Sequence, residues 1–386
     1  MIDVEPTFTW LLHGAPGAKT PLDVLDRACP ELRQAGIPLD RLEAVVRTLH
    51  PHIAGRSFLW VPSGKVVVKE RTYVELNSAE FEKSAVAEVF RDGQTVRYHL
   101  EIGETGEHPE LVSLAEEGFT DFIAIPMTFI SGTIHAVTFA TRRPSGFSLE
   151  EREALKRVML PLARVAEIFA LLRTATNLLN TYVGHGAGER ILGGQIRRGD
   201  VGLIHAVIWF SDLRGFTSMS SVSAPTDIIA TLNEVFDCQV PPIEANHGEV
   251  LKFMGDGMLA IFPVHDENDR RERVDDALVA AKHALYALDK LNAKRTSRGQ
   301  EPVRFGIALH IGEIAYGNIG GSGRLDFTCI GPAVNLAARL ETLTGKLGRN
   351  VIVSEEFAEL ASSPLEQLGE FELKGVETPA RVFGIL

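Results

Sequence analysis

The stretch Ala206–Phe216, AVIWFSDLRGF, leads from an apolar block directly into an acidic residue and a glycine. The apolar residues at its start predict a short strand that is covered on both faces. Asp212 stands where this strand leaves the core, so its carboxylate is held in place and can reach a cation. Gly215 permits a turn, and Thr217 or Ser218 is predicted to cap a helix whose amides face an anion. Many strands end in Asp only because Asp favours the turn that follows. A metal site therefore needs a second carboxylate.

A second aspartate lies at the tip of a predicted hairpin in Glu249–Phe262, EVLKFMGDGMLAIF. Val250–Phe253 and Met258–Phe262 have the composition of strands, and glycines flank Asp256 between them. An ordinary Asp-Gly hairpin turn is one explanation. The alternative is that two aspartates on neighbouring strand ends hold two divalent ions about 3.5–4 Å apart. Oxygen ligands favour Mg²⁺ or Mn²⁺.

Four motifs from about Leu203 onwards, in this order, resemble the catalytic domain of class III adenylate cyclases. They are FSDLRGFT, LKFMGDGMLAIF, DFTCIGPAVNLAARLE and FELKGV. The resemblance implies an α+β fold with a ferredoxin-like βαββαβ catalytic domain over residues 201–386. It also implies an antiparallel homodimer with active sites between the subunits.

By this resemblance, Asp212 and Asp256 match the two metal-binding aspartates, and the Leu213 carbonyl would be a further metal ligand. Each active site would hold two Mg²⁺ or Mn²⁺ ions. Gly215 and Phe216, which follow the first aspartate, are expected to contact the substrate.

Five further residues match the nucleotide-contacting positions of the family: Lys252, Thr328, Asn335, Arg339 and Lys374. Lys252 and Thr328 would select adenine, because a lysine donates to the N1 acceptor and a hydroxyl can accept from the amino group. Guanylate cyclases typically have glutamate and cysteine there. Asn335 would orient the ribose, Arg339 would stabilise the transition state, and Lys374 would contact the triphosphate. The aspartates would face the first four of these residues in the partner subunit.

The expected reaction converts ATP to 3′,5′-cyclic AMP and pyrophosphate by two-metal-ion catalysis. Two residues depart from the family: Glu313 stands where some members have a phosphate-binding arginine, which could weaken polyphosphate binding, and Pro332 replaces a common aspartate, a change expected to be structural. A non-catalytic nucleotide-binding module with the same fold is the main alternative. A diguanylate cyclase would need a GG[DE]EF-type motif, which the sequence lacks.

Composition limits the other possible functions of this 386-residue chain. A net charge of −12 argues against nucleic-acid binding, and no segment has the length and hydropathy of a membrane span. The start of the sequence has no pattern of a targeting signal, so a cytoplasmic location is expected. The three cysteines are too few for a disulfide framework and are predicted to be reduced packing residues.

Residues 1–147 are predicted to form a mixed α/β regulatory domain. Helical apolar spacing covers Leu22–Leu32 and Leu39–Leu49. Strands are predicted at Ser57–Val61, Lys65–Val68, Thr95–Leu100, Phe122–Phe129 and Thr133–Ala140. This order resembles a GAF-like sensor domain and implies an unidentified small-molecule effector. Bicarbonate is a further possible effector, because the Thr-containing branch of the cyclases includes bicarbonate-responsive members.

Residues 148–200 are predicted to connect the two domains through a long helix. Its apolar residues recur at three- and four-residue steps: Leu155, Val158, Leu162, Val165, Ile168, Leu172, Ala175 and Leu179. This seam favours a coiled-coil dimer contact, and the alternative is one amphipathic helix lying on its own domain. The glycine-rich stretch Gly184–Gly199 is expected to act as a hinge.

In the catalytic domain, helices are predicted at Ala224–Ile243 and Arg270–Leu291 and strands at Phe305–Ile311 and Ile314–Ile319. A last helix is predicted to start at Pro332, with Asn335 and Arg339 on one face.

Overall fold

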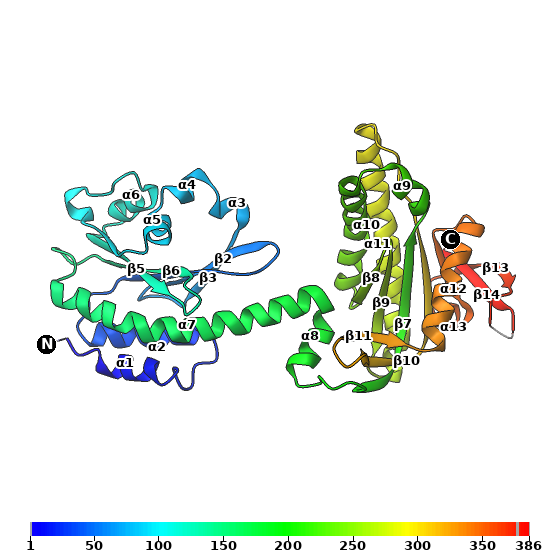
Figure 1. Ribbon diagram of the computed structural model, residues 1–386, viewed down its shortest axis with the longest axis horizontal. Helices are drawn as coiled ribbons and strands as arrows, with labels where there is room; N and C mark the ends of the chain where they lie inside the picture. The colour runs from blue at the N-terminus through cyan, green and yellow to red at the C-terminus, as the bar shows by residue number, and fades with distance from the viewer. Residues whose placement is uncertain (1, 376–377, 386) are drawn as a thin grey trace. The chain divides into compact units, whose positions relative to one another are not determined.

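The computed structural model describes residues 2–375 and 378–385, which form two compact units that divide between Leu178 and Leu179 (Figure 1). The division falls inside one long helix, α7 (Leu149–Val183). In the part of the chain that the structure describes, no helix combines the length and apolar character needed to cross a bilayer.

The N-terminal unit is built on an antiparallel six-stranded sheet in the order β3-β2-β1-β6-β5-β4. The strands are β1 Arg41–Arg47, β2 Ile53–Trp60, β3 Val67–Thr72, β4 Val96–Tyr98, β5 Asp121–Thr128 and β6 Ile134–Thr141. The helices are α1 Glu5–Leu12, α2 Pro21–Gln34, α3 Tyr73–Leu76, α4 Ala79–Glu82, α5 Ala85–Asp92 and α6 Pro109–Glu116, followed by α7.

Helices cover both faces of this sheet (Figure 1). Helices α1, α2 and α7 bury one face, where Leu42, Val46 and Phe139 belong to the larger hydrophobic core. Helices α5 and α6 bury the other face around Val45 and Phe122. The predicted mixed α/β architecture is therefore confirmed, and the resemblance to a GAF domain stays a prediction.

The helix predicted at Leu39–Leu49 is wrong, because these residues form the central strand β1. Both faces of β1 are covered, so apolar residues occur on both sides and their spacing imitates a helical stripe. The other predictions for this unit are confirmed with shifted bounds. They are helix α2 and the strands β2, β3, β4, β5 and β6.

The predicted dimer seam of α7 is wrong over its first half. Leu155, Val158, Leu162 and Val165 are buried in the hydrophobic core of the N-terminal unit, so they are unavailable to a partner helix. This matches the alternative of an amphipathic helix on its own domain. Beyond them, Ile168 is 61% exposed.

The C-terminal unit has an eight-stranded sheet in the order β13-β14-β12-β10-β7-β9-β8, with β11 paired to β10. Its strands are β7 Val201–Leu213, β8 Glu249–Met254, β9 Gly257–Val264, β10 Phe305–Gly320, β11 Leu325–Ile330, β12 Val351–Ser354, β13 Leu365–Phe371 and β14 Ala380–Ile385. Its helices are α8 His185–Leu192, α9 Phe216–Val222, α10 Pro225–Ala245, α11 Arg270–Ser297, α12 Pro332–Lys346 and α13 Glu355–Leu360.

The chain order of β7, α10, β8, β9, α11, β10, α12 and β12 contains the predicted βαββαβ arrangement. Helices α10 and α11 pack on one face of the sheet around Trp209 and Phe262, both of which are fully buried. On the other face, α12 packs against β10 and β7. Strand β10 is continuous where two strands were predicted, because its residues from Phe305 to Gly317 pair without interruption with β7.

Two local predictions for this unit need correction. Neither Thr217 nor Ser218 caps α9, because the helix already starts at Phe216 after Gly215, whose φ of 75° is left-handed. The predicted hinge Gly184–Gly199 is not one loop, since helix α8 occupies half of it. Gly184 precedes α8 with a left-handed φ of 88°, and a Cβ at that position would lie 2.9 Å from the Val250 carbonyl oxygen.

The three cysteines are free and buried, as predicted.

Candidate active site

Asp212 and Asp256 come together at one end of the central strands. Strand β7 pairs with β9 through Ser211 and Met258, which places Asp212 beside the tip of the β8-β9 hairpin that carries Asp256. Burial, followed by the negative charges of Asp256 and Glu341, raises the pKa of Asp212 to about 6. The structure therefore brings together the two carboxylates that sequence analysis assigned to metal binding.

This donor set fits a hard divalent cation. Two partly buried carboxylates repel each other unless a cation or a proton lies between them. The Leu213 backbone follows directly at the end of β7, and its carbonyl is the neutral oxygen donor expected from the sequence. Within the described ranges, no group of three His, Cys, Asp or Glu side chains is positioned to hold a metal, so a bound ion would need substrate or water oxygens as well.

Sequence analysis missed Glu341 as a third carboxylate near this pair. Glu341 lies on α12, and a Cβ at Gly306 would be 2.8 Å from its Oε1, so the missing side chain at Gly306 makes room for it. Burial raises the pKa of Glu341, and the charge of Asp256 acts in the same direction. The one feature of the sequence that could have identified Glu341 is its place as the last residue of the motif DFTCIGPAVNLAARLE.

Lys252 and Thr328 form a second group of predicted residues. Thr328 is 5% exposed, and its Oγ1 has no hydrogen-bond partner within the described chain. Burial raises the pKa of the neighbouring Cys329 to about 11, and the positive charge of Lys252 opposes this shift, which places Lys252 close to β11. A buried acceptor and a cation thus lie where the sequence predicted a base-recognition pair.

Asn335 and Arg339 lie one turn apart on the exposed side of α12, as predicted. The Arg339 Nη1 donates to the Gly375 carbonyl oxygen at 3.4 Å, so Arg339 lies beside the LKG segment that contains Lys374. In residues 2–375 and 378–385, none of Lys252, Arg339 and Lys374 forms an ion pair. Three unpaired cations are suited to a polyphosphate ligand.

The structure does not bring all predicted residues together within one chain. Asp212 lies opposite Gly306 on β10, and Thr328 lies opposite Gly317 on the same strand. At about 3.3 Å per residue, these two positions are separated by roughly 35 Å of strand. Figure 1 shows α9 and β11 at opposite ends of the sheet. Within one chain, Asp212 and Thr328 therefore belong to two separate groups of predicted residues.

The remaining predicted residues fall into three cases. The Phe216 side chain packs against the core, which leaves its backbone and that of the exposed Gly215 at the start of α9 for a ligand. Pro332 is the first residue of α12, a position that favours proline, and the structural reason for its replacing an aspartate stays a prediction. Glu313 is exposed on β10, and its effect on polyphosphate binding stays a prediction.

The family model described as "Adenylate and Guanylate cyclase catalytic domain" matches residues 204–385. This segment is a nucleotide cyclase catalytic domain. The chain is similar to an adenylate cyclase of Anabaena cylindrica, with 34% identity over 181 residues, which cover 46% of this chain and 34% of that protein. It is also similar to adenylate cyclase 1 of Rhizobium meliloti, with 26% identity over 46% of this chain and 27% of that protein. The chain spans about a third of the length of the curated relatives it matches.

The cyclase domain is also similar to solved structures. The adenylyl cyclase CyaB from P. aeruginosa has 22% identity and a TM-score of 0.44, over 48% of this chain and 95% of that chain. The guanylyl cyclase Cya2 has 31% identity and a TM-score of 0.42, over 48% of this chain and 93% of that chain.

Proposed function

We propose that this chain is an adenylate cyclase that converts ATP to 3′,5′-cyclic AMP and pyrophosphate at a homodimer interface. The observation that carries the proposal is the pair of carboxylates Asp212 and Asp256 at the end of the central strands. The choice of ATP over GTP rests on Lys252 and on the Thr328 hydroxyl, which has no hydrogen-bond partner among the described residues.

Each residue has a specific role in this reaction. The Thr328 Oγ1 accepts a hydrogen bond from the adenine amino group, and Lys252 donates to N1. Asn335 orients the ribose so that its 3′-oxygen faces the α-phosphate. A bond forms from this oxygen to the α-phosphorus, the bond to the bridging oxygen of pyrophosphate breaks, and the hydroxyl proton passes to solvent. Arg339 stabilises the negative charge that develops on the α-phosphate, and Lys374 binds the polyphosphate.

Asp212, Asp256 and the Leu213 carbonyl would hold two Mg²⁺ or Mn²⁺ ions. Bound there, the ions would lower the pKa of the 3′-hydroxyl and neutralise the triphosphate. The backbone of Gly215 and Phe216 would contact the phosphates from the start of α9.

The homodimer is part of the proposal because, by the family resemblance, the metal-binding aspartates of one chain face Lys252, Thr328, Asn335 and Arg339 of the other. A second copy in antiparallel orientation would place Thr328 and Arg339 of one chain against Asp212 and Asp256 of the other. Exposed apolar side chains flank the base-recognition residues: Phe253 next to Lys252 is 53% exposed and Ile330 is 52% exposed. Apolar surface of this kind is typical of a protein–protein interface.

The test measures product formation from ATP and from GTP with Mn²⁺. Wild type should form cyclic AMP and little cyclic GMP, and both Asp256→Ala and Arg339→Ala should be inactive. A mixture of the two variants should recover part of the activity, because a mixed dimer retains one intact site. A protein that binds ATP and dimerises but forms no product would support a non-catalytic nucleotide-binding module instead. Inactive mixtures of stable dimers would contradict the shared site.

We further propose that residues 1–147 regulate the cyclase through the connecting segment 148–200. Support comes from Glu249 at the start of β8, the strand that contains Lys252. The Glu249 Oε1 accepts from the Ala187 amide in α8 at 3.0 Å, and its Oε2 accepts from the Tyr316 hydroxyl at 3.1 Å. A displacement of α8 would therefore act on β8. Removing residues 1–199 should change turnover or abolish the effector response, and unchanged behaviour in both would refute regulation.

A further inference from the structure

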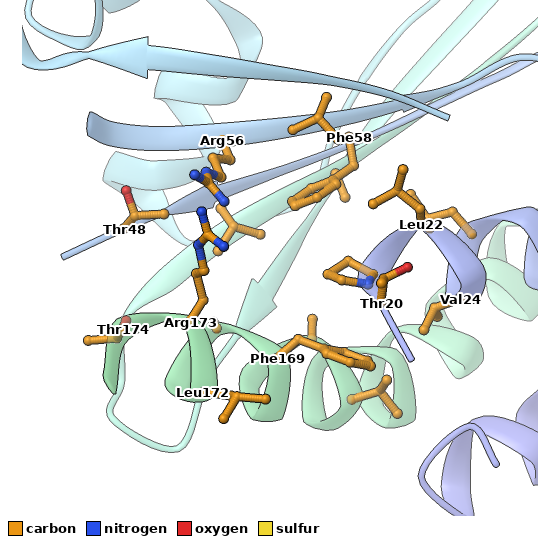
Figure 2. A pocket seen from close by; sticks show the side chains of 18 of the residues that line it. Thr20, Leu22, Val24, Thr48, Arg56, Phe58, Phe169, Leu172, Arg173 and Thr174 are labelled. Carbon is orange, nitrogen blue, oxygen red and sulfur yellow. The ribbon is translucent and has the colours of Figure 1, made fainter. Parts of the chain in front are cut away.

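The N-terminal unit contains a pocket between the sheet and helices α2 and α7 (Figure 2). Its volume of about 390 Å³ lies in the range of about 300–1,000 Å³ found for small-molecule sites. The floor is apolar and buried, and it is formed by Val46, Met127, Leu162 and Val165. Phe58 and Phe169 add aromatic surface to the walls. Such a floor favours the apolar body of a ligand over a polar one.

Two arginines from opposite walls face each other across this pocket. Figure 2 shows Arg56 of β2 and Arg173 of α7 pointing toward one another. Arg56 also forms an ion pair with Glu70 of the adjacent strand. Across the described ranges, Arg173 forms no ion pair. Like charges that face each other repel, and an anion placed between them turns the repulsion into two attractions.

The other two cations of the lining, Lys19 and Arg47, form no ion pair within the described ranges. The carboxylate of Asp23 accepts a hydrogen bond from the Lys19 amide at 2.8 Å, so a negative charge lies beside Lys19. The Arg47 guanidinium stacks on the Phe90 ring at 4.4 Å from its centroid, and Phe90 belongs to the core on the other face of the sheet. None of the residues that line the pocket, all within the described ranges, is acidic.

We propose that this pocket binds a medium-chain aliphatic carboxylic acid. The aliphatic chain of the ligand lies on the apolar floor of the pocket, and its carboxylate lies between Arg56 and Arg173. After the ion pair of Arg56 with Glu70, the two arginines leave a surplus of one positive charge, which matches a singly charged carboxylate. A doubly charged phosphate monoester would exceed the surplus at this pair of arginines, and a nucleobase would leave its polar edges unpaired on the floor.

Helix α7 connects the pocket to the cyclase domain along the chain. Ala166, Phe169, Ala170 and Arg173 of this helix line the pocket, and the helix continues to Val183. A ligand that contacts this face fixes the position of α7 relative to β2. The effect of such a ligand on turnover rests on the proposed cyclase function, but its binding does not.

The test is isothermal titration calorimetry of the full chain without nucleotide, using decanoate, decanol and decyl phosphate below their aggregation limits. Decanoate should bind one to one and decanol at least tenfold more weakly. Arg173→Gln should weaken decanoate binding roughly ten- to a hundredfold, because it removes charge-assisted hydrogen bonds. Ala170→Phe should weaken it by a similar factor by filling the pocket. Arg152→Gln, on the same helix but outside the lining, should leave binding unchanged.

Circular dichroism of each variant checks that it folds, and the comparison of decanoate with decanol on wild type does not depend on any variant. Absence of saturable decanoate binding overturns the site. Equal binding of decanol, or undiminished binding in both pocket variants, overturns the role of the arginines and of the cavity. Tighter binding of decyl phosphate overturns the carboxylate assignment. A protein that forms no cyclic AMP gives the same calorimetric result, so the two proposals fail separately.

Discussion

Replacing Thr328 by valine is expected to stabilise the cyclase domain while weakening its use of ATP. The Thr328 hydroxyl is buried and has no hydrogen-bond partner within the described chain. A buried polar group without a partner costs about 1–3 kcal/mol, and valine is well suited to a strand such as β11. The free energy of unfolding should rise by about 1 kcal/mol, which corresponds to about 2–4 °C in Tm for a domain of this size.

The same substitution removes the acceptor for the adenine amino group. Loss of one such hydrogen bond should lower kcat/KM for ATP about tenfold. Urea denaturation and initial rates measure the two effects on the same samples. Thr344→Val is the control for stability, because the Thr344 hydroxyl donates to the Glu341 carbonyl oxygen at 2.7 Å and its loss should destabilise the domain by about 1 kcal/mol. A Thr328→Val protein that is less stable, or that keeps its kcat/KM, would refute this reasoning.

Three further predictions concern other parts of the chain. Burial lowers the pKa of His135 to about 4, so the folded N-terminal unit favours the neutral ring. The contribution of His135 to the free energy of unfolding is complete above pH 6.5 and should fall by about 3 kcal/mol as the pH drops to 4. Urea titrations at several pH values should show a smaller pH dependence of this free energy in His135→Gln. Glu249→Gln weakens two charge-assisted hydrogen bonds and should lower the free energy of unfolding of the cyclase domain, measured in urea, by about 1 kcal/mol. An unchanged urea midpoint would contradict the contact of Glu249 with α8. The double variant Lys252→Glu, Thr328→Cys should raise the ratio of kcat/KM for GTP over ATP at least about tenfold, measured as cyclic nucleotide product; an unchanged ratio would count against these residues as the base-recognition pair.

The parts of the fold that sequence predicts well are those with strong local signals. Strand β7 has a continuous apolar block, and the β8-β9 hairpin has glycines on both sides of Asp256. Pro332 marks the start of α12, which puts Asn335 and Arg339 on one side of the helix. In each case the local pattern and the tertiary environment favour the same conformation.

The errors occur where burial, and not local preference, decides the structure. Leu39–Leu49 has apolar residues on both faces because β1 lies between two helical layers, and that pattern is shared by strands and helices. In α7, the same apolar stripe suits a partner helix or the sheet of its own domain. Glu341 influences the charge of the aspartate pair, and Arg56 faces Arg173, although these residues are distant in sequence and carry no periodic signal.

The distribution of charge over the cyclase domain favours one orientation of the proposed dimer. The end of the sheet with Asp212, Asp256 and Glu341 has clustered carboxylates, and burial together with their mutual repulsion holds the pKa of Asp212 near 6. Lys252 and Arg339 are cations without ion-pair partners within the described chain. A dimer that places the cations of each chain opposite the carboxylates of the other is stabilised by their attraction, whereas a dimer that places like charges opposite each other is destabilised. The same charges that would bind ATP with its metal ions would therefore also select the partner orientation that completes the site.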